Sequence, residues 1–156
     1  MYTRTRFSLY KIKMKTLSLL QPWASLTVMG YKTIETRSWS TTHRGPLLIH
    51  ASKGRKGAVL STEAPFTKYI SAFNSLPFGA IIGQVWLEDV VPVEQLFLSD
   101  SRLAKLTLEE KAFGDYTKGR WAWLLAEPIQ FTHPIPIGGS LSLWEYRGDL
   151  PEELNY

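Results

Sequence analysis

Short alternations of hydrophobic and polar positions recur along this chain, a pattern typical of half-buried strands. Stretches of this kind, rich in aliphatic and aromatic residues, predict strands at residues 15–20, 31–39, 47–50, 80–91, 121–125 and 141–146. Three proline residues between positions 128 and 136 predict that the extended segment there lies at a sheet edge, because proline cannot donate a ladder hydrogen bond.

Helical signals are fewer and shorter. Pro22 suits the first turn of a helix and Gly30 suits its end, which predicts a helix between them. Thr107 and Glu110 have the spacing of a capping box, so residues 108–113 are also predicted to be helical. Three further short helices are expected at residues 58–63, 66–74 and 93–97.

Long crossover helices between the strands are missing, which argues against a doubly wound sheet. The elements instead predict an α+β fold that is mostly β: a compact β-barrel of about six strands with short helices at its ends. The length of 156 residues suits one domain, expected at residues 14–150. Residues 1–13 are expected to be an N-terminal extension or an alternative start, and residues 151–156 an acidic tail.

Composition excludes several classes of site. The chain has no cysteine, which rules out disulfides, thiolate zinc sites and a cysteine nucleophile. Its three histidines, at positions 43, 50 and 133, show no metal-ligand spacing, so neither a metal nor another cofactor is expected. No apolar run approaches the roughly 18 residues of a membrane span, and residues 1–13 lack the apolar core of a secretory signal. These features favour a cytoplasmic protein without a membrane partner.

The net charge of +4 is unevenly distributed. Residues 1–13 carry four basic and no acidic residues, which accounts for the whole excess. Residues 14–60 hold seven basic residues and one acidic residue, whereas residues 61–156 hold seven and thirteen. This polarity predicts an anion-facing surface built by the first half of the chain, unless the two signs interleave in the folded protein.

The strand expected at residues 31–39 carries an unusual polar row. Side chains alternate along a strand, so Glu35, Arg37 and Trp39 share one face and place a carboxylate, a guanidinium and an indole in one line. Lys32 lies an odd number of positions from these residues, so its side chain would point to the other face of the strand unless the preceding turn extends to it. One interpretation is a solvated face with an ion pair of little energetic value. The other is a cleft lined by both charges and an aromatic platform, which the apolar surface of Trp39 favours.

Further cations lie close to these strands. Residues 53–57 read Lys-Gly-Arg-Lys-Gly, a basic loop that can present cations and N–H groups to a phosphate but lacks the spacing of a nucleoside-triphosphate loop. Arg120 precedes an expected strand and is a candidate anion contact. Each of these residues, taken alone, is more often simply solvated.

The same stretches resemble a known family. The run Gln21-Pro22-Trp23-Ala24, the pattern Gly-x-Lys-x-x-Glu-x-Arg at residues 30–37 and the run Ile-His-Ala-Ser at residues 49–52 are together similar to the ASCH domain family. Matches at residues 119–123 and 143–144 extend the resemblance over about residues 17–144.

The resemblance implies a PUA-like β-barrel and a role with RNA or DNA, or a small enzyme acting on RNA or on modified nucleosides. It also implies a cleft beside the barrel that is lined by Lys32, Glu35 and Arg37. The residues that it places at the rim of this cleft are Gln21, Trp23, Ser25, His50, Ser52, Lys53 and Arg120.

Single-stranded nucleic acid is the ligand that these residue types favour, since cations hold phosphates and aromatic rings stack on bases. Arg44 adds to the cations already named, and Trp23 and Trp39 supply stacking faces. Glu35 and Gln84 are candidate acceptors for a base amine. The expected partner is RNA or another single strand, or a nucleoside-like small molecule.

A hydrolase is the alternative. The resemblance includes a small bacterial relative that hydrolyses acetylated cytidine with a lysine, a threonine and a glutamate. Lys32 matches the lysine, but Glu35 stands in place of the threonine and Gln84 in place of the glutamate, and a neutral glutamine cannot act as a general base. Lys32 and Glu35 are therefore catalytic candidates only if the protein is an enzyme. A ribonuclease that uses His50, Lys32 and a serine is a third option.

Overall fold

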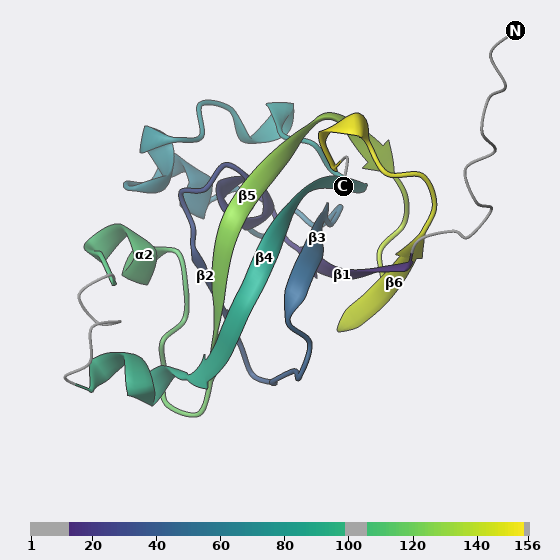
Figure 1. Ribbon diagram of the computed structural model, residues 1–156. Coiled ribbons are helices and arrows are strands. Elements are labelled where there is room, and N and C mark those ends of the chain that lie inside the picture. Colours follow the sequence, from purple (N-terminus) through teal and green to yellow (C-terminus); the bar gives the residue numbers. More distant parts are fainter. Residues whose placement is uncertain (1–12, 99–105, 155–156) are drawn as a thin grey trace, which may run out of the picture.

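A computed structural model of the protein describes residues 13–98 and 106–154. Its sheet comprises β1 (Lys13–Leu19), β2 (Ile34–Arg37), β3 (Gly45–Ala51), β4 (Ala80–Pro92), β5 (Trp121–Pro136) and β6 (Leu143–Arg147). Two short α-helices, α1 (Trp23–Val28) and α2 (Leu108–Ala112), come after β1 and β4 in the chain, and α2 lies outside the sheet on the side of β2 (Figure 1). No helix in these two ranges is long and apolar enough to cross a membrane. Apart from its last residue, the expected N-terminal extension lies outside the described residues.

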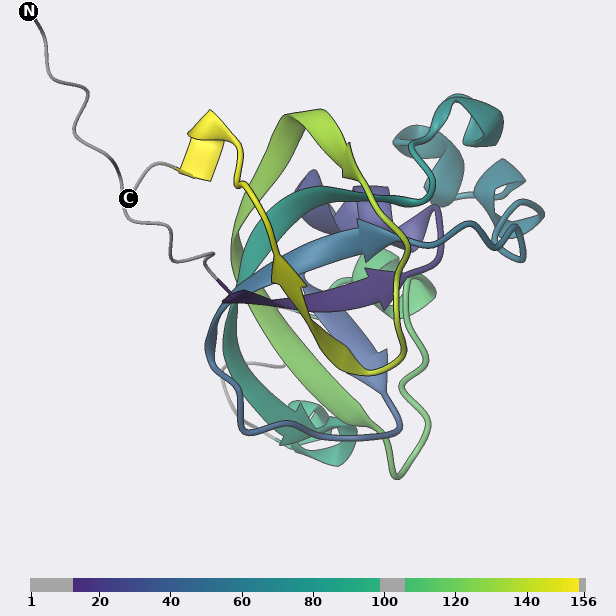
Figure 2. The same ribbon diagram turned by 90° about the vertical axis from the view of Figure 1, so that its right-hand side faces the viewer.

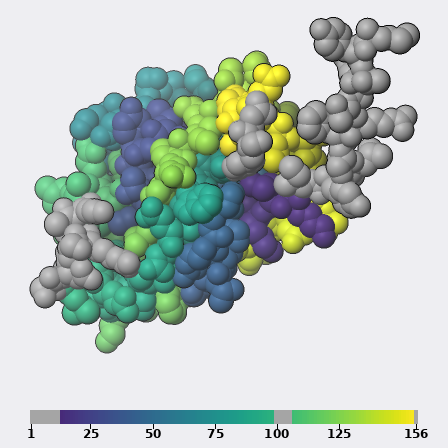
Figure 3. Space-filling view, in the orientation of Figure 1, coloured from purple at the N-terminus to yellow at the C-terminus, as the bar shows by residue number. Residues whose placement is uncertain are grey.

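The strands form one mixed sheet in the order β2-β5-β4-β3-β1-β6. β1 and β3 run parallel, and the other neighbouring pairs are antiparallel. The register between β4 and β5 shifts repeatedly, and such bulges bend strands, so the sheet is strongly coiled (Figure 2). β1 and β6, from opposite ends of the chain, pair with each other and lie side by side at the surface (Figure 3). The mostly β fold of about six strands agrees with the prediction.

The sheet does not close into the expected barrel. β2 is one edge and β6 is the other, and no ladder joins them within the described residues. β2 has only four residues, so it offers few main-chain groups to a partner on its open side. One side chain crosses the gap instead: Arg37 Nη2 donates to the carbonyl of Ser18, in β1, at 3.0 Å. We call this gap between β2 and β1 the seam.

The prolines of β5 lie at a local edge, as predicted. Residues 121–124 of β5 are paired with β2 on one side and with β4 on the other. The later half, which contains Pro128, Pro134 and Pro136, is paired with β4 alone within the described residues. Proline is tolerated there because one side of the strand has no ladder to maintain.

α1 packs against β1, β3, β4 and β5 and completes the main apolar core. Val28 of this helix lies directly over Gly83 of β4, where a Cβ atom would come within 2.6 Å of Val28 Cγ1. The glycine therefore permits the close approach of the helix to the sheet. The core beneath them contains Leu17, Leu47, Ile49, Val85 and Trp123, each exposed by 1% or less.

The second strand is shorter than predicted because its first residues complete the turn after α1. Gly30 has a φ of +84°, a left-handed conformation that favours glycine, and the Lys32 N–H donates to the Leu26 carbonyl. Lys32 thus belongs to the turn. Because Lys32 is outside the strand, the alternation of side chains no longer places it on the opposite face from Glu35.

The two helices expected between residues 58 and 74 are replaced by single 3₁₀ turns: η1 (Leu60–Thr62), η2 (Phe66–Lys68) and η3 (Phe73–Ser75). Hydroxyl groups compete for the local carbonyls here, since Ser61 donates to Ala58 and Thr62 to Val59, each at 2.6 Å. Two further turns of this kind are η4 (Val93–Phe97), where a helix was expected, and η6 (Glu152–Leu154) in the acidic tail.

A buried glutamate holds the start of β2. The Glu110 carboxylate, in α2, accepts hydrogen bonds from the N–H groups of Thr33 and Ile34 and from the Thr33 hydroxyl, at 2.9–3.1 Å, and the residue is 4% exposed. Thr107 caps α2 by accepting from the Glu110 N–H, as the capping box predicts. The glutamate side chain, however, reaches across to β2 and so ties the helix to the sheet.

Replacing Glu110 with glutamine should lower the free energy of unfolding by about 1.5–3 kcal/mol, the usual value of hydrogen bonds to a charged group. An amide has one acceptor oxygen, and its N–H groups would face other donors. Urea unfolding at neutral pH measures the change. The matched control is Glu88→Gln, at an exposed position of β4, which should shift the free energy by less than about 0.5 kcal/mol. Equal stability of the two variants would show that the Glu110 carboxylate does not hold β2.

Candidate functional site

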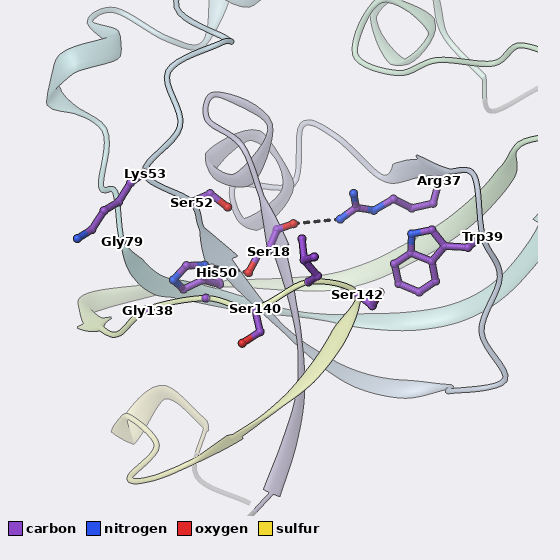
Figure 4. Close-up of a pocket in the computed structure, with 12 residues that line it drawn as sticks. Ser18, Arg37, Trp39, His50, Ser52, Lys53, Gly79, Gly138, Ser140 and Ser142 are labelled. Carbon is purple, nitrogen blue, oxygen red and sulfur yellow. Dashed lines mark hydrogen bonds between the residues drawn. The ribbon is translucent and has the colours of Figure 1, made fainter.

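A pocket of about 660 Å³ lies at the seam, where the sheet fails to close. The ends of β1, β2 and β3, the turn before β4 and the β5–β6 loop, residues 137–142, form its wall (Figure 4). Its lining residues are Ser18, Arg37, Trp39, His50, Ser52, Lys53, Gly79 and residues 138–142. We call this cavity the seam pocket.

Arg37 and Trp39 form one end of the seam pocket. The Arg37 guanidinium, which spans the seam to Ser18, lies 5.8 Å from the centre of the Trp39 ring. The Trp39 indole rests edge-on against Trp123 of the core, with ring centres 4.9 Å apart. Its position is therefore fixed by packing while it stays partly exposed.

A chain of hydrogen bonds forms the middle of the pocket wall. His50 Nε2 lies 2.7 Å from the Ile137 carbonyl oxygen, which can only accept, so the ring is protonated at Nε2. Nδ1 of the neutral ring then accepts from the Ser18 hydroxyl, 3.0 Å away, and the Ser18 oxygen accepts from Trp144 Nε1–H at 3.1 Å. Burial lowers the pKa of His50 from its usual 6.5, against the opposing effect of the Ile137 hydrogen bond.

The β5–β6 loop lies directly on this chain of hydrogen bonds. A Cβ atom at Gly139 would come within 2.6 Å of both His50 Cε1 and Ser18 Oγ, so only glycine allows this approach. A Cβ atom at Gly138, by contrast, would meet nothing within 4 Å. The loop thus brings its main chain against the pocket wall and leaves open space beside Gly138.

The seam pocket is positively charged. Arg37 and Lys53 line it together with serine hydroxyls and glycines, and none of its lining residues is a carboxylate. Lys53 makes no ion pair or hydrogen bond with another described residue, so its ammonium is available to a ligand. Figure 4 shows Lys53 at one end of the pocket and Arg37 with Trp39 at the other, with Ser18 and His50 between them. This arrangement suits an anionic ligand with a flat apolar part.

Lys32, Glu35 and Arg37, which the family resemblance places in one cleft, form a row of charges but do not line one hollow. Glu35 lies between the two cations: Oε2 is 3.2 Å from Lys32 Nζ, and Oε1 is 3.9 Å from Arg37 Nε. Lys32 is 2% exposed and also donates to the Ile34 carbonyl. Of the three, only Arg37 lines the seam pocket, whereas Glu35 and Trp23 line a smaller hollow of about 310 Å³.

The other predicted site residues are divided between the seam pocket and the rest of the molecule. The predicted residues that the structure brings together in the pocket are Arg37, Trp39, His50, Ser52 and Lys53. Those that lie in the interior, each 5% exposed or less, are Gln21, Ser25 and Gln84. Gln21 is a structural tie, since its Nε2 donates to Ser25 Oγ and to the Pro77 carbonyl, both at 2.8 Å. Arg44 and Arg120 lie outside the pocket lining, and each is ion-paired with an aspartate.

Sequence reasoning missed Ser18, Gly79 and the β5–β6 loop. No local pattern in the sequence connects residues 138–142 with His50 or Lys53. The available signal was composition: the run Gly-Gly-Ser-x-Ser at residues 138–142 has few bulky side chains, as loops that approach other groups closely often do.

Residues 17–135 match the family model of the ASCH domain. This chain belongs to the ASCH domain family. Crystal structures of ASCH from Zymomonas mobilis share its fold: one aligns with a TM-score of 0.53 and 21% identity over 86% of this chain and 87% of that one. A point mutant of the same protein aligns with a TM-score of 0.51 and 21% identity over 90% and 91%. At this identity the likeness concerns the fold alone.

This ASCH domain is also similar to part of a longer protein. It is 30% identical over 138 residues to Activating signal cointegrator 1 from Mus musculus, and 29% identical over 138 residues to the Homo sapiens protein of that name. Each match covers 83% of this chain and 22% of the relative. The chain therefore spans about a fifth of the length of these relatives.

The buried, neutral His50 predicts that acid destabilises this ASCH domain. Because its pKa is lower in the folded chain, the unfolded chain binds more protons as the pH falls below about 6.5, and the free energy of unfolding decreases there. Urea unfolding at several pH values between about 5 and 8 measures this slope.

Two histidine variants separate the contribution of His50 to this pH dependence from that of the other titratable groups. His50→Gln should flatten the slope, whereas His133→Gln, at an exposed histidine, should keep it. An unchanged slope in the His50 variant would contradict the assignment of a neutral, buried ring.

Proposed function

We propose that this ASCH domain binds single-stranded nucleic acid, RNA in particular, through the seam pocket. The observation that carries the proposal is the pocket lining: two cations, Arg37 and Lys53, and a partly exposed indole, Trp39, with no carboxylate among them. Cations on phosphates and aromatic faces under bases are the two means by which proteins hold flexible strands.

The size of the pocket supports a contact with one nucleotide at a time. Its volume of about 660 Å³ falls within the usual range of small-ligand sites, about 300–1,000 Å³. One stacked base contributes about 1–3 kcal/mol, and each neutralised phosphate adds a salt-dependent contribution. The expected binding is modest in strength and weakens as salt is added. A nucleoside-like small molecule would use the same pocket.

The hydrolase alternatives have less support. Lys32 is 2% exposed and is held by Glu35 and the Ile34 carbonyl, so a substrate has no access to it in this arrangement. Gln84, which stands in place of the catalytic glutamate of the acetylcytidine hydrolase, is 5% exposed. A ribonuclease would need His50 as a base, yet both of its ring nitrogens are hydrogen-bonded within the protein.

Trp39→Leu should weaken the binding of a short single-stranded RNA by about 5- to 150-fold, the loss expected for one stacked base. Leucine keeps an apolar contact with the core, so the fold is retained. Fluorescence anisotropy at low salt measures the affinity. The control is Trp86→Leu: Trp86 is 40% exposed on β4 and does not line the seam pocket, so this variant should bind as the unmodified protein does. Equal affinities of the two variants would contradict the assignment of the site.

The salt dependence of the same binding should reflect the two cations of the pocket. For single strands the logarithm of the affinity falls by about 0.7 per phosphate contact for each tenfold rise in salt, so two contacts predict a slope of about −1.4. Anisotropy titrations between about 50 and 200 mM salt measure this slope. An affinity that does not change with salt would exclude phosphate contacts as part of the binding.

A further inference from the structure

The two ends of the seam pocket differ in kind. Arg37 and Trp39 lie at the open seam, whereas Lys53 and Gly79 lie together at the opposite end (Figure 4). A nucleotide that stacks on Trp39 therefore directs the rest of its length toward Lys53. The charge and the hydrogen-bond donors at the Lys53 end determine which part of a nucleic-acid strand fits beside Lys53.

Main-chain hydrogen bonds tie together the segments at the Lys53 end of the pocket. The Gly79 N–H donates to the Ala51 carbonyl at 2.7 Å, and the Gly79 carbonyl accepts from the Ile137 N–H at 3.1 Å. These bonds join the end of β3, the turn before β4 and the end of β5 into one wall.

Lys53 is positioned against this wall and left without a partner. Its stem lies across Gly79, where a Cβ atom would come within 2.7 Å of Lys53 Cε and 3.3 Å of Cγ. Gly79 has a φ of +63°, which also favours glycine. The Lys53 ammonium has neither an ion pair nor a hydrogen bond to any residue that the structure describes. A cation held beside a pocket and left unpaired suits an anion with several acceptor oxygens.

The β5–β6 loop lines the same pocket with uncharged polar groups. The N–H groups of Gly138, Gly139 and Ser140 donate to no other group within residues 13–98 and 106–154. The hydroxyls of Ser52 and Ser140 line the same pocket. Unpaired N–H groups of successive loop residues, together with a lysine, are a recurrent means of holding phosphate.

We propose that the seam pocket holds the phosphorylated end of a single strand, with the terminal phosphomonoester at Lys53 and the adjacent base at Trp39. This inference rests on the proposed nucleic-acid binding and specifies which part of the strand is recognised. A monoester carries about −1.5 to −2 charges at neutral pH and has three free oxygens, more than an internal phosphodiester offers to a single ammonium. A diester must also continue in both directions, whereas a terminal monoester continues in only one.

Three versions of one short RNA test this inference: one with a 5′-phosphate, one with a 3′-phosphate and one with hydroxyls at both ends, each with an internal fluorophore. We expect at least one phosphorylated strand to bind the full chain about tenfold more tightly than the hydroxyl-ended strand, the effect of one charge-assisted hydrogen bond. The preferred end reports the direction of the strand in the pocket. Lys53→Gln should abolish this preference. Lys56→Gln, an exposed neighbour in the same loop that does not line the pocket, should keep it.

The outcomes distinguish this inference from the proposed function. Equal affinity of the three strands would overturn the inference, as would a phosphate preference that survives in Lys53→Gln. If the hydroxyl-ended strand still binds and Trp39→Leu weakens it, nucleic-acid binding stands and the preference for a phosphorylated end is wrong. Absence of binding by all three strands would overturn both.

Discussion

One guanidinium joins two parts of the sheet between which the described residues form no ladder. Arg37 reaches from the end of β2 to the Ser18 carbonyl of β1 at 3.0 Å. A continuous ladder would bring these strands to the roughly 4.8 Å spacing of neighbouring strands, which leaves no room for a ligand. A long side chain spans a wider gap and leaves its remaining donors at the edge. The incomplete closure of the sheet is therefore the physical origin of the seam pocket.

The ion row that ends at Arg37 gives this gap its charge. Glu35 is the single carboxylate of the row, with Lys32 Nζ at 3.2 Å on one side and Arg37 Nε at 3.9 Å on the other. A buried lysine requires compensation, because an uncompensated charge in the interior is costly, and Lys32 obtains it from Glu35 and from a main-chain carbonyl. One acid thus serves two cations, and the remaining positive charge lies at Arg37, the exposed end. Because the buried Lys32 takes up much of the charge of Glu35, the Arg37 guanidinium is available to an anion.

Close packing keeps the middle of the pocket wall neutral. Gly139 lets the β5–β6 loop rest on His50 and Ser18, and the resulting burial favours the uncharged imidazole. The hydrogen bonds of His50 to Ser18 and Ile137 satisfy both ring nitrogens. The pocket therefore has cationic donors at its two ends and, between them, a neutral histidine whose ring nitrogens are both paired. This separation of charge distinguishes the seam pocket from a uniformly basic surface.

Much of the local structure could be predicted from the sequence, because it depends on neighbours along the chain. The strand at residues 80–91 is β4 (Ala80–Pro92), and the Thr107 cap starts α2 as its spacing predicts. Arg37 and Trp39 lie together in the pocket as expected, although β2 ends at Arg37 and Trp39 lies in the bend that follows it. The site could be predicted only in part. Gln21 and Lys32 belong to the same motif as Arg37, yet they are 0% and 2% exposed.

Alternation, capping and the ASCH motif by themselves determined most of the strands, the start of α2 and the family, since each is written within a few neighbouring positions. Only the tertiary structure decided that the sheet stays open, that Lys32 is buried, and that Ser18 and the β5–β6 loop face His50. These outcomes depend on how segments far apart in the chain pack against each other. Whether a polar side chain lines a pocket or the interior is decided by its distant neighbours, and no local pattern contains them.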